Sequence, residues 1–141
     1  MPRPINESAD AIDLSPRFVR SAVVVASPAA AAETIICQTA AIGDVAVLAG
    51  VRLSGWAAFT VGTTGTACTL RLRQTNVAGT IVASTGAVTG GIAAANLVTL
   101  DVEGFDAAAV APAQVYVLTL QVTGGSAAST VSGVLLAGLI I

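Results

Sequence analysis

The fold is decided by residues 51–75, which read VRLSGWAAFTV, then GTTGT, then ACTLRLRQT. Apolar and polar side chains alternate along residues 51–61 and again along residues 67–75, so each segment has one apolar and one polar face. A period of two residues predicts a β-strand that lays one face against a core. The Gly/Thr segment between them predicts a turn that joins two such strands.

The same alternation predicts which side chains face the core. Along residues 67–75 the inner set is Cys68, Leu70 and Leu72, whereas Arg71 and Arg73 face outward onto a solvated surface. The inner sets expected from the two other alternating segments are Val51, Leu53, Ala57, Phe59 and Val61, and Val98, Leu100 and Val102. A slip of one residue would bury charged side chains, so the pattern of each strand determines which of its two faces meets the core.

Strand and turn signals recur along the rest of the chain. The segments expected to be strands are residues 21–26, 33–38, 46–61, 67–75, 80–84, 96–103, 114–123 and 130–141, with a loop over residues 104–113. About eight short strands, spaced by Gly, Pro, Ser and Thr, are typical of a sandwich or a barrel. The sequence therefore predicts an all-β protein, an antiparallel β-sandwich.

The chain divides by charge into two regions. Residues 1–20 hold six of the fourteen charged residues and three of the five prolines, and they show no sustained apolar period. They predict an extended N-terminal arm. Residues 21–141 carry the strand pattern and predict one domain, as expected for this length.

Composition excludes several classes of function. The chain has a net charge of −2, whereas a nucleic-acid-binding protein needs a basic surface to displace counterions. Its longest apolar run at the C-terminus, residues 131–141, is well short of the roughly 20 residues of a spanning helix. We therefore expect neither a nucleic-acid partner nor a membrane partner.

The residue types that drive most enzyme chemistry are missing. The chain has no histidine and no lysine, and two cysteines are too few ligands for the usual zinc sites. We therefore expect no cofactor and no enzymatic activity. The remaining carboxylates, Asp101, Glu103 and Asp106, could serve as an acid–base pair or bind a cation. The alternative is a solvated face, or an ion pair with Arg71 or Arg73 across a sheet.

Three other side chains allow more than one interpretation. Trp56 could be a platform for carbohydrate, or an anchor in a core or an interface. Cys37 and Cys68 lie in apolar runs and are expected to be small buried hydrophobic residues. A disulfide between them stays open, since adjacent strands would bring them close enough.

Residues 114–122 and residues 131–141 are apolar on both faces. A strand of this kind is covered on both sides, so we expect another subunit, or the arm, to cover the outer side. The alternative is a strand enclosed by a barrel or capped by a loop. The interface candidates are Val115, Val117, Val134, Leu136 and Ile140, with Arg3, Arg17, Phe18 and Arg20 from the arm.

The pairs of segments just described resemble a known class of protein. Residues 51–75, together with AQVYVLTLQVTGG and STVSGVLLAGLII near the C-terminus, resemble small jelly-roll proteins of tailed-phage virions, notably head decoration (cement) proteins. The resemblance covers residues 21–141 in the rhythm of strands. It implies a jelly roll of about eight strands, a homotrimer on the capsid surface, and arms that reach neighbouring subunits.

We therefore expect a structural virion protein that binds and stabilises the phage head, with itself and the major capsid protein as partners. The alternatives within the same class are a tail, fibre or baseplate component and a small coat protein. An alternative of another class is a lectin-like binding module that uses Trp56.

Overall fold

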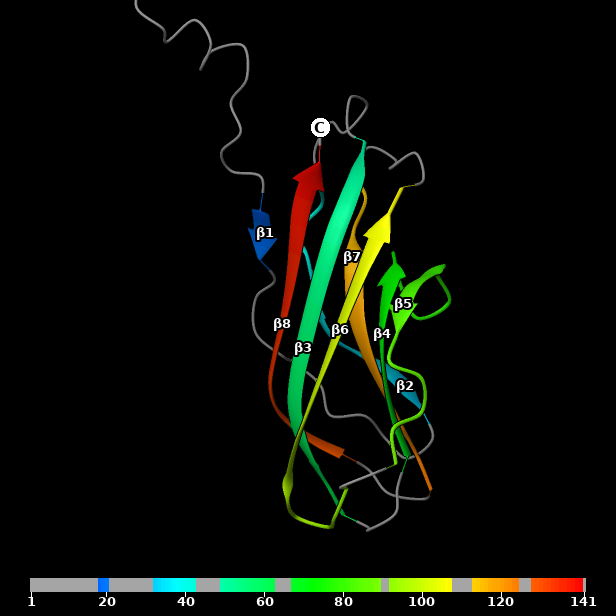
Figure 1. The fold of residues 1–141 in the computed structure, drawn as a ribbon, viewed down its shortest axis with the longest axis vertical. Coiled ribbons are helices and arrows are strands. Elements are labelled where there is room, and N and C mark those ends of the chain that lie inside the picture. The colour runs from blue at the N-terminus through cyan, green and yellow to red at the C-terminus, as the bar shows by residue number, and fades with distance from the viewer. Residues whose placement is uncertain are drawn as a thin grey trace, which may run out of the picture.

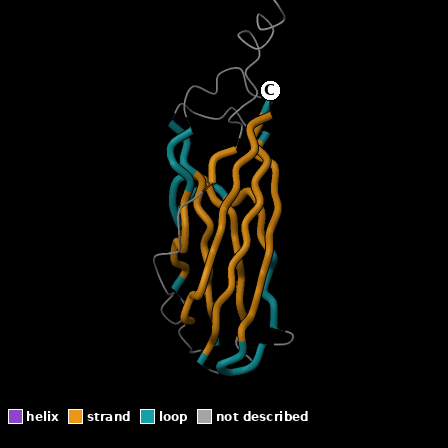
Figure 2. Tube along the Cα trace, turned by 90° about the vertical axis from the view of Figure 1, so that its left-hand side faces the viewer, coloured by secondary structure: helices purple, strands orange, loops and turns teal. Residues whose placement is uncertain are grey.

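The computed structural model describes residues 18–20, 32–42, 49–62, 67–89, 92–107, 113–124 and 128–140. Within these ranges the secondary structure is entirely β, and two layers of strands run along the length of an elongated molecule (Figures 1 and 2). The strands are β1 (Phe18–Arg20), β2 (Glu33–Gln38), β3 (Gly50–Val61), β4 (Ala67–Gln74), β5 (Ile81–Ser84), β6 (Leu97–Asp106), β7 (Tyr116–Thr123) and β8 (Ala128–Ile140).

The strand order is that of a jelly roll. Sheet A has the order β1-β8-β3-β6, and sheet B has the order β2-β7-β4-β5. The first strand pairs with the last, β2 with β7, β3 with β6 and β4 with β5, always antiparallel. The eight strands form one long antiparallel hairpin, with β1 to β4 in one arm and β5 to β8 in the other. This hairpin is rolled up so that β8 also pairs with β3 and β7 with β4. The predicted antiparallel β-sandwich with a jelly-roll arrangement is confirmed.

Most of the predicted strands are found close to their predicted bounds. Residues 33–38 form β2 as expected, and β3 to β8 begin or end within a few residues of the prediction. The predicted strand over residues 21–26 lies outside the described residues. Residues 46–48 of the strand predicted over residues 46–61 also lie outside them.

The loop predicted to begin at residue 104 is wrong for its first three residues. β6 continues to Asp106, because Gly104, Phe105 and Asp106 pair with Leu53, Arg52 and Val51 of β3. The Asp106 carboxylate is buried and accepts hydrogen bonds from Gln74 Nε2 at 2.6 Å and from the Tyr116 hydroxyl at 2.9 Å. These two hydrogen bonds supply partners that a buried carboxylate needs. No pattern in the sequence predicts them.

The core lies between the two sheets and contains the side chains that the alternation predicts. Leu53 and Phe59 of β3 and Leu70 and Leu72 of β4 are fully buried. Gly55 in the middle of β3 lets the layers approach closely, since an added Cβ atom there would lie 2.6 Å from Leu118 Cδ1 of the opposite sheet. The predicted facing of these strands is confirmed.

Part of the predicted arm belongs to sheet A. Phe18 pairs with Gly138, Val19 with Ala137 and Arg20 with Leu136, so the last three residues of the region 1–20 form the edge strand β1. Residues 1–17 lie outside the described residues, and the division of the chain at residue 20 stays a prediction.

Candidate functional site

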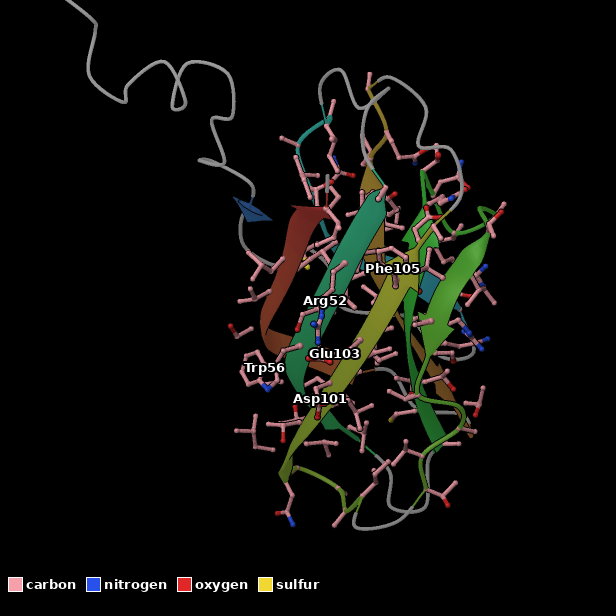
Figure 3. All side chains as sticks on the ribbon, turned by 45° about the horizontal axis from the view of Figure 1, so that its top comes forward. Arg52, Trp56, Asp101, Glu103 and Phe105 are labelled. Carbon is pink, nitrogen blue, oxygen red and sulfur yellow. The ribbon has the colours of Figure 1, made fainter. Side chains whose placement is uncertain are left out.

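The candidate site is the outer surface of sheet A. Alternation places every second side chain of β3, β6 and β8 on this surface, which we call face A. β3 and β6 contribute exposed side chains that Figure 3 shows on the near side of the sheet, namely Arg52, Trp56, Asp101, Glu103 and Phe105. β8 contributes Val134, Leu136 and Ile140, which pair with Trp56, Ser54 and Gly50.

Large apolar side chains gather on face A. In the described part of the chain six large hydrophobic side chains are exposed, and four of them belong to this face: Trp56 at 39%, Leu97 at 61%, Phe105 at 53% and Ile140 at 43%. Single exposed apolar side chains are ordinary, but several on one face mark a contact surface.

Phe105 and Ile140 are joined across Gly50. An added Cβ atom on Gly50 would lie 2.5 Å from Phe105 Cζ, so the aromatic ring covers this glycine, and Gly50 pairs with Ile140. Because Gly50 has no side chain, the ring of Phe105 on β6 has room to lie over the neighbouring strand β3. The result is one apolar stretch that runs across all three strands at this end of face A.

A depression of about 490 Å³ opens on face A beside this apolar stretch. Its lining comes from all three strands and consists of Arg52, Ser54, Glu103, Leu136, Gly138, Leu139 and Ile140. Gly138 carries no side chain, which leaves a hollow between its larger neighbours. A second hollow of about 380 Å³ shares Arg52 and Glu103 and is bounded by Gly104 and Phe105. Face A is therefore a ridged surface with apolar walls and one charged pair.

The charged pair on face A is weakly held. Arg52 Nη2 lies 3.6 Å from Glu103 Oε2, and the side chains are 69% and 62% exposed. An exposed ion pair of this kind contributes about 0–1 kcal/mol to stability. Both groups therefore remain available to another molecule.

The outer surface of sheet B, which we call face B, has the opposite character. Glu33 of β2 accepts two hydrogen bonds from Arg73 of β4, at 2.7 Å from Nε and 2.9 Å from Nη2. Arg71 Nη1 lies 3.1 Å from the same carboxylate, and the Thr119 hydroxyl of β7 donates to it at 2.5 Å. The three charged side chains are only 13–19% exposed. One carboxylate thus ties three strands together.

The electrostatics of face B favour an ionised Glu33. Burial raises the pKa of this carboxyl, but the hydrogen bonds from Arg73 and Thr119 and the charges of Arg71 and Arg73 outweigh burial. The pKa of Glu33 therefore lies below the ordinary value of 4.5. Arg71 Nη1 also donates to Gln121 Oε1 at 2.9 Å, and Arg73 Nη1 donates to the Gly79 carbonyl at 2.8 Å.

One alternative for the charged residues is excluded, and one prediction about them is wrong. Asp101 and Glu103 do not pair with Arg71 or Arg73, because β6 belongs to sheet A and β4 to sheet B. The face of β4 that carries Arg71 and Arg73 is not solvated, since both side chains are largely covered. The sequence did not identify Glu33 as their partner. Its position at the start of a strand was the available signal, but nothing local showed that β2 lies two strands from β4.

The three candidate carboxylates do not form one site. Asp101 and Glu103 lie on face A, whereas Asp106 points inward and is bonded to Gln74 and Tyr116. Burial and the neighbouring Asp106 carboxylate raise the pKa of Tyr116 far above its usual value. Among the described residues no group of three or more His, Cys, Asp or Glu side chains could hold a metal ion.

The interface candidates are divided between the two faces. Val134, Leu136 and Ile140 lie on face A, where Val134 and Leu136 are half-buried and Ile140 is exposed. Val115 and Val117 lie on the side of sheet B, and Val117 has no exposed surface. Its backbone pairs with Arg73 on β4 and Gln38 on β2, and its role as a contact residue stays a prediction.

The arm candidates are placed only in part. Phe18 and Arg20 belong to β1, where their backbones pair with Gly138 and Leu136 next to the depression. Arg3 and Arg17 lie outside the described residues.

Neither cysteine forms a disulfide and both are buried, as expected for small hydrophobic residues. Cys37 lies on β2 and Cys68 on β4, and β7 separates these strands, which excludes the adjacent-strand disulfide left open above. Burial raises the pKa of the Cys68 thiol. The described part of the chain contains no helix long and apolar enough to cross a membrane.

No family model matches the chain, and no curated protein matches it. Among solved structures the chain is similar to VP2 of infectious bursal disease virus in its subviral particle, with a TM-score of 0.57 and 14% identity over 89% of this chain and 33% of VP2. A mutant VP2 in derived T=1 particles gives a TM-score of 0.57 and 12% identity over 89% of this chain and 32% of VP2.

A chain in the structure of the Gx strain of the same virus gives a TM-score of 0.51 and 14% identity, over 84% of this chain and 29% of that one. The chain thus spans about a third of the length of these viral chains. At such identities the likeness concerns the fold. The chain is a jelly-roll β-sandwich that resembles viral capsid protein domains.

Proposed function

We propose that this chain is a structural component of a virus particle, a capsid decoration (cement) protein that binds and stabilises a phage head as an oligomer. The observation that carries the proposal is the combination of a capsid-like jelly roll with an outer sheet face that leaves large apolar side chains uncovered. The proposed partners are further copies of the chain and the major capsid protein, on the outer surface of the head.

The proposed role requires contact area and rigidity, not chemistry. Two four-stranded sheets packed around one core give a stiff module, and apolar side chains on face A supply area whose burial contributes about 25 cal/mol per Å². Each contact on a capsid lattice is repeated many times, so weak contacts add through effective concentration. No catalytic group or cofactor takes part in the proposed role.

The arm predicted over residues 1–20 fits the same role. β1 anchors its last three residues to β8 at the edge of sheet A, so the arm is attached to the sandwich beside face A. An anchored segment of this kind can reach a neighbouring subunit. Several such arms in an oligomer would bind cooperatively.

A second candidate function is favoured by one observation on face A. Trp56 is 39% exposed and its backbone pairs with Asp101 on β6, so an aromatic and an acidic residue occupy neighbouring positions of face A. Aromatic rings with polar neighbours also bind sugars, as in a lectin-like module. Loss of glycan retention in Trp56→Ala would support this function, and a blank glycan array for the unaltered chain would remove it.

The proposed function is tested on virus particles made by the organism that encodes the chain. An antibody against the chain is applied to gradient-purified particles, and labelling is located by electron microscopy. Label spread over the heads supports a decoration protein, and label on tails supports the tail, fibre or baseplate alternative. Release of the chain by mild denaturant with the shell intact separates decoration from a small coat protein. Particles that lack the chain would overturn the virion function.

A further inference from the structure

We propose that face A is the self-association surface of this chain, and that it binds face A of a second copy so that Arg52 of each copy meets Glu103 of the other. This inference deepens the proposed function, on which it rests for the oligomer, by naming the surface and the ion pairs that form it.

Exposed apolar side chains lie on all three strands of face A. Trp56 lies on the central strand of the face, and Phe105 and Ile140 adjoin each other across Gly50 on its two flanking strands. Leu136 and Ile140 also wall the depression, so a protruding side chain of a second copy would meet apolar surface there. Tryptophan is among the residues that contribute most to protein interfaces.

The charges favour a second copy over a partner of one sign. Arg52 and Glu103 lie side by side at 3.6 Å, and both are more than 60% exposed. Besides the further carboxylate of Asp101, face A thus carries two adjacent groups of opposite sign, and such a pair is complementary to itself when a two-fold axis passes between the two groups. Each copy then contributes one half of two equivalent Arg–Glu pairs. Burial of these pairs strengthens an attraction that solvent screens in the single chain.

The size of face A sets the expected affinity. Its three long strands have 13, 12 and 10 residues. At about 3.3 Å per residue and about 4.8 Å between strands, their flat outline is roughly 500 Å². Protruding side chains make the accessible area larger, so two copies would bury on the order of 1,200 Å², the lower end of specific interfaces. We therefore expect a micromolar dimer that a repeated lattice would reinforce.

The test is sedimentation velocity over a concentration series, with the full chain and the variants Arg52→Glu and Glu103→Arg. Each variant alone places like charges across the two-fold contact, and we expect its dimer to dissociate at least about tenfold more readily. In an equimolar mixture one copy carries carboxylates at both positions and the other guanidinium groups at both. We expect the mixture to regain the dimer with a one-to-one composition.

The mixture separates a contact between copies from a contact within one. Both variants keep like charges within their own chain, so the regained dimer can arise only across the interface. The control Ile81→Glu replaces an exposed apolar residue of sheet B, at 47% exposure, and should leave the dimer unchanged. Circular dichroism confirms that each variant is folded.

Three results would overturn the inference. They are a full chain that stays monomeric at every concentration, an oligomer that Arg52→Glu leaves unchanged, and a mixture that fails to associate. Retention of a glycan by Trp56 with no self-association would assign face A to carbohydrate instead. The proposed function fails separately, since particles without the chain would reject it whatever the sedimentation shows.

Discussion

The two outer faces of the sandwich differ in how much of their charged and apolar side chains is exposed. Face B encloses Glu33, Arg71 and Arg73 in a network that leaves each side chain under a fifth exposed. Face A holds its ion pair in solvent, at more than 60% exposure, among uncovered apolar side chains. The comparison teaches that charged residues in strands do not by themselves mark a wet face. Face B is completed within the chain, whereas face A offers its groups to another molecule.

The sharpest way to break this comparison is to remove the carboxylate of face B. Glu33→Ala leaves Arg71 and Arg73 largely covered without their shared anion, and we expect a loss of about 2–3 kcal/mol in the free energy of unfolding. Urea unfolding at neutral pH measures it. Gln38→Ala, at an exposed position of the same strand, should change stability by less than about 0.5 kcal/mol. Equal losses in both variants would show that the network does not stabilise face B.

A matched pair of isosteric changes sharpens the comparison at the next level. Val117→Thr buries a hydroxyl on face B, where the side chain has no exposed surface, and should cost about 1–2 kcal/mol. Val134→Thr adds the same hydroxyl to the half-buried side chain on face A and should cost less than about 0.5 kcal/mol. Thermal unfolding at low protein concentration measures both. A larger cost for Val134→Thr would reverse the order of the two faces.

The pH dependence of stability isolates Glu33 in a smaller effect. Because its pKa is lowered by folding, its contribution is complete above 4.5 and is lost as pH falls through the folded value. The stability difference between the unaltered chain and Glu33→Gln should therefore narrow when unfolding is measured at about pH 3 instead of about pH 6. A difference that stays constant across this range would contradict the lowered pKa.

The smallest expected effect comes from the ion pair on face A. Glu103→Gln removes one charge of an exposed pair, and the monomer should lose less than about 0.5 kcal/mol. Unfolding at concentrations where the chain is monomeric measures this value. A loss approaching that of Glu33→Ala would mean that the two faces use their charges alike.

The sequence predicted the fold class because alternation is a local property. Leu70, Leu72, Leu53 and Phe59 were assigned to the core from their own neighbours in the chain, and each is fully buried. The buried state of Cys37 and Cys68 followed from the same apolar runs. The candidate surface was predicted in part, since the two-sided apolar pattern of the last strand nominated Val134, Leu136 and Ile140.

The errors share a physical cause, because each depended on which strands are neighbours. An ion pair between Arg71 or Arg73 and the acids of β6 was left open, but the partner of both arginines lies on β2, 40 residues from Arg73. Val117 had the same two-sided apolar pattern as Val134, yet Val117 in sheet B is fully buried whereas Val134 in sheet A is half-buried. The extension of β6 to Asp106 depended on pairing with β3. The burial of the Asp106 carboxylate depended on the hydrogen bonds that it accepts from Tyr116 and Gln74.

By itself the sequence determined that this chain is a β-sandwich and which side of each strand meets the core, since the two-residue period of a strand is written in adjacent residues. Only the tertiary structure decided the jelly-roll order and, with it, the difference between the two outer faces. Thr119 donates to Glu33 from 86 residues away, and a bond across such a distance depends on which strands the roll brings together. Face B is closed and face A open because that order places the partners of Arg71 and Arg73 in sheet B and leaves Arg52, Trp56 and Phe105 facing outward from sheet A.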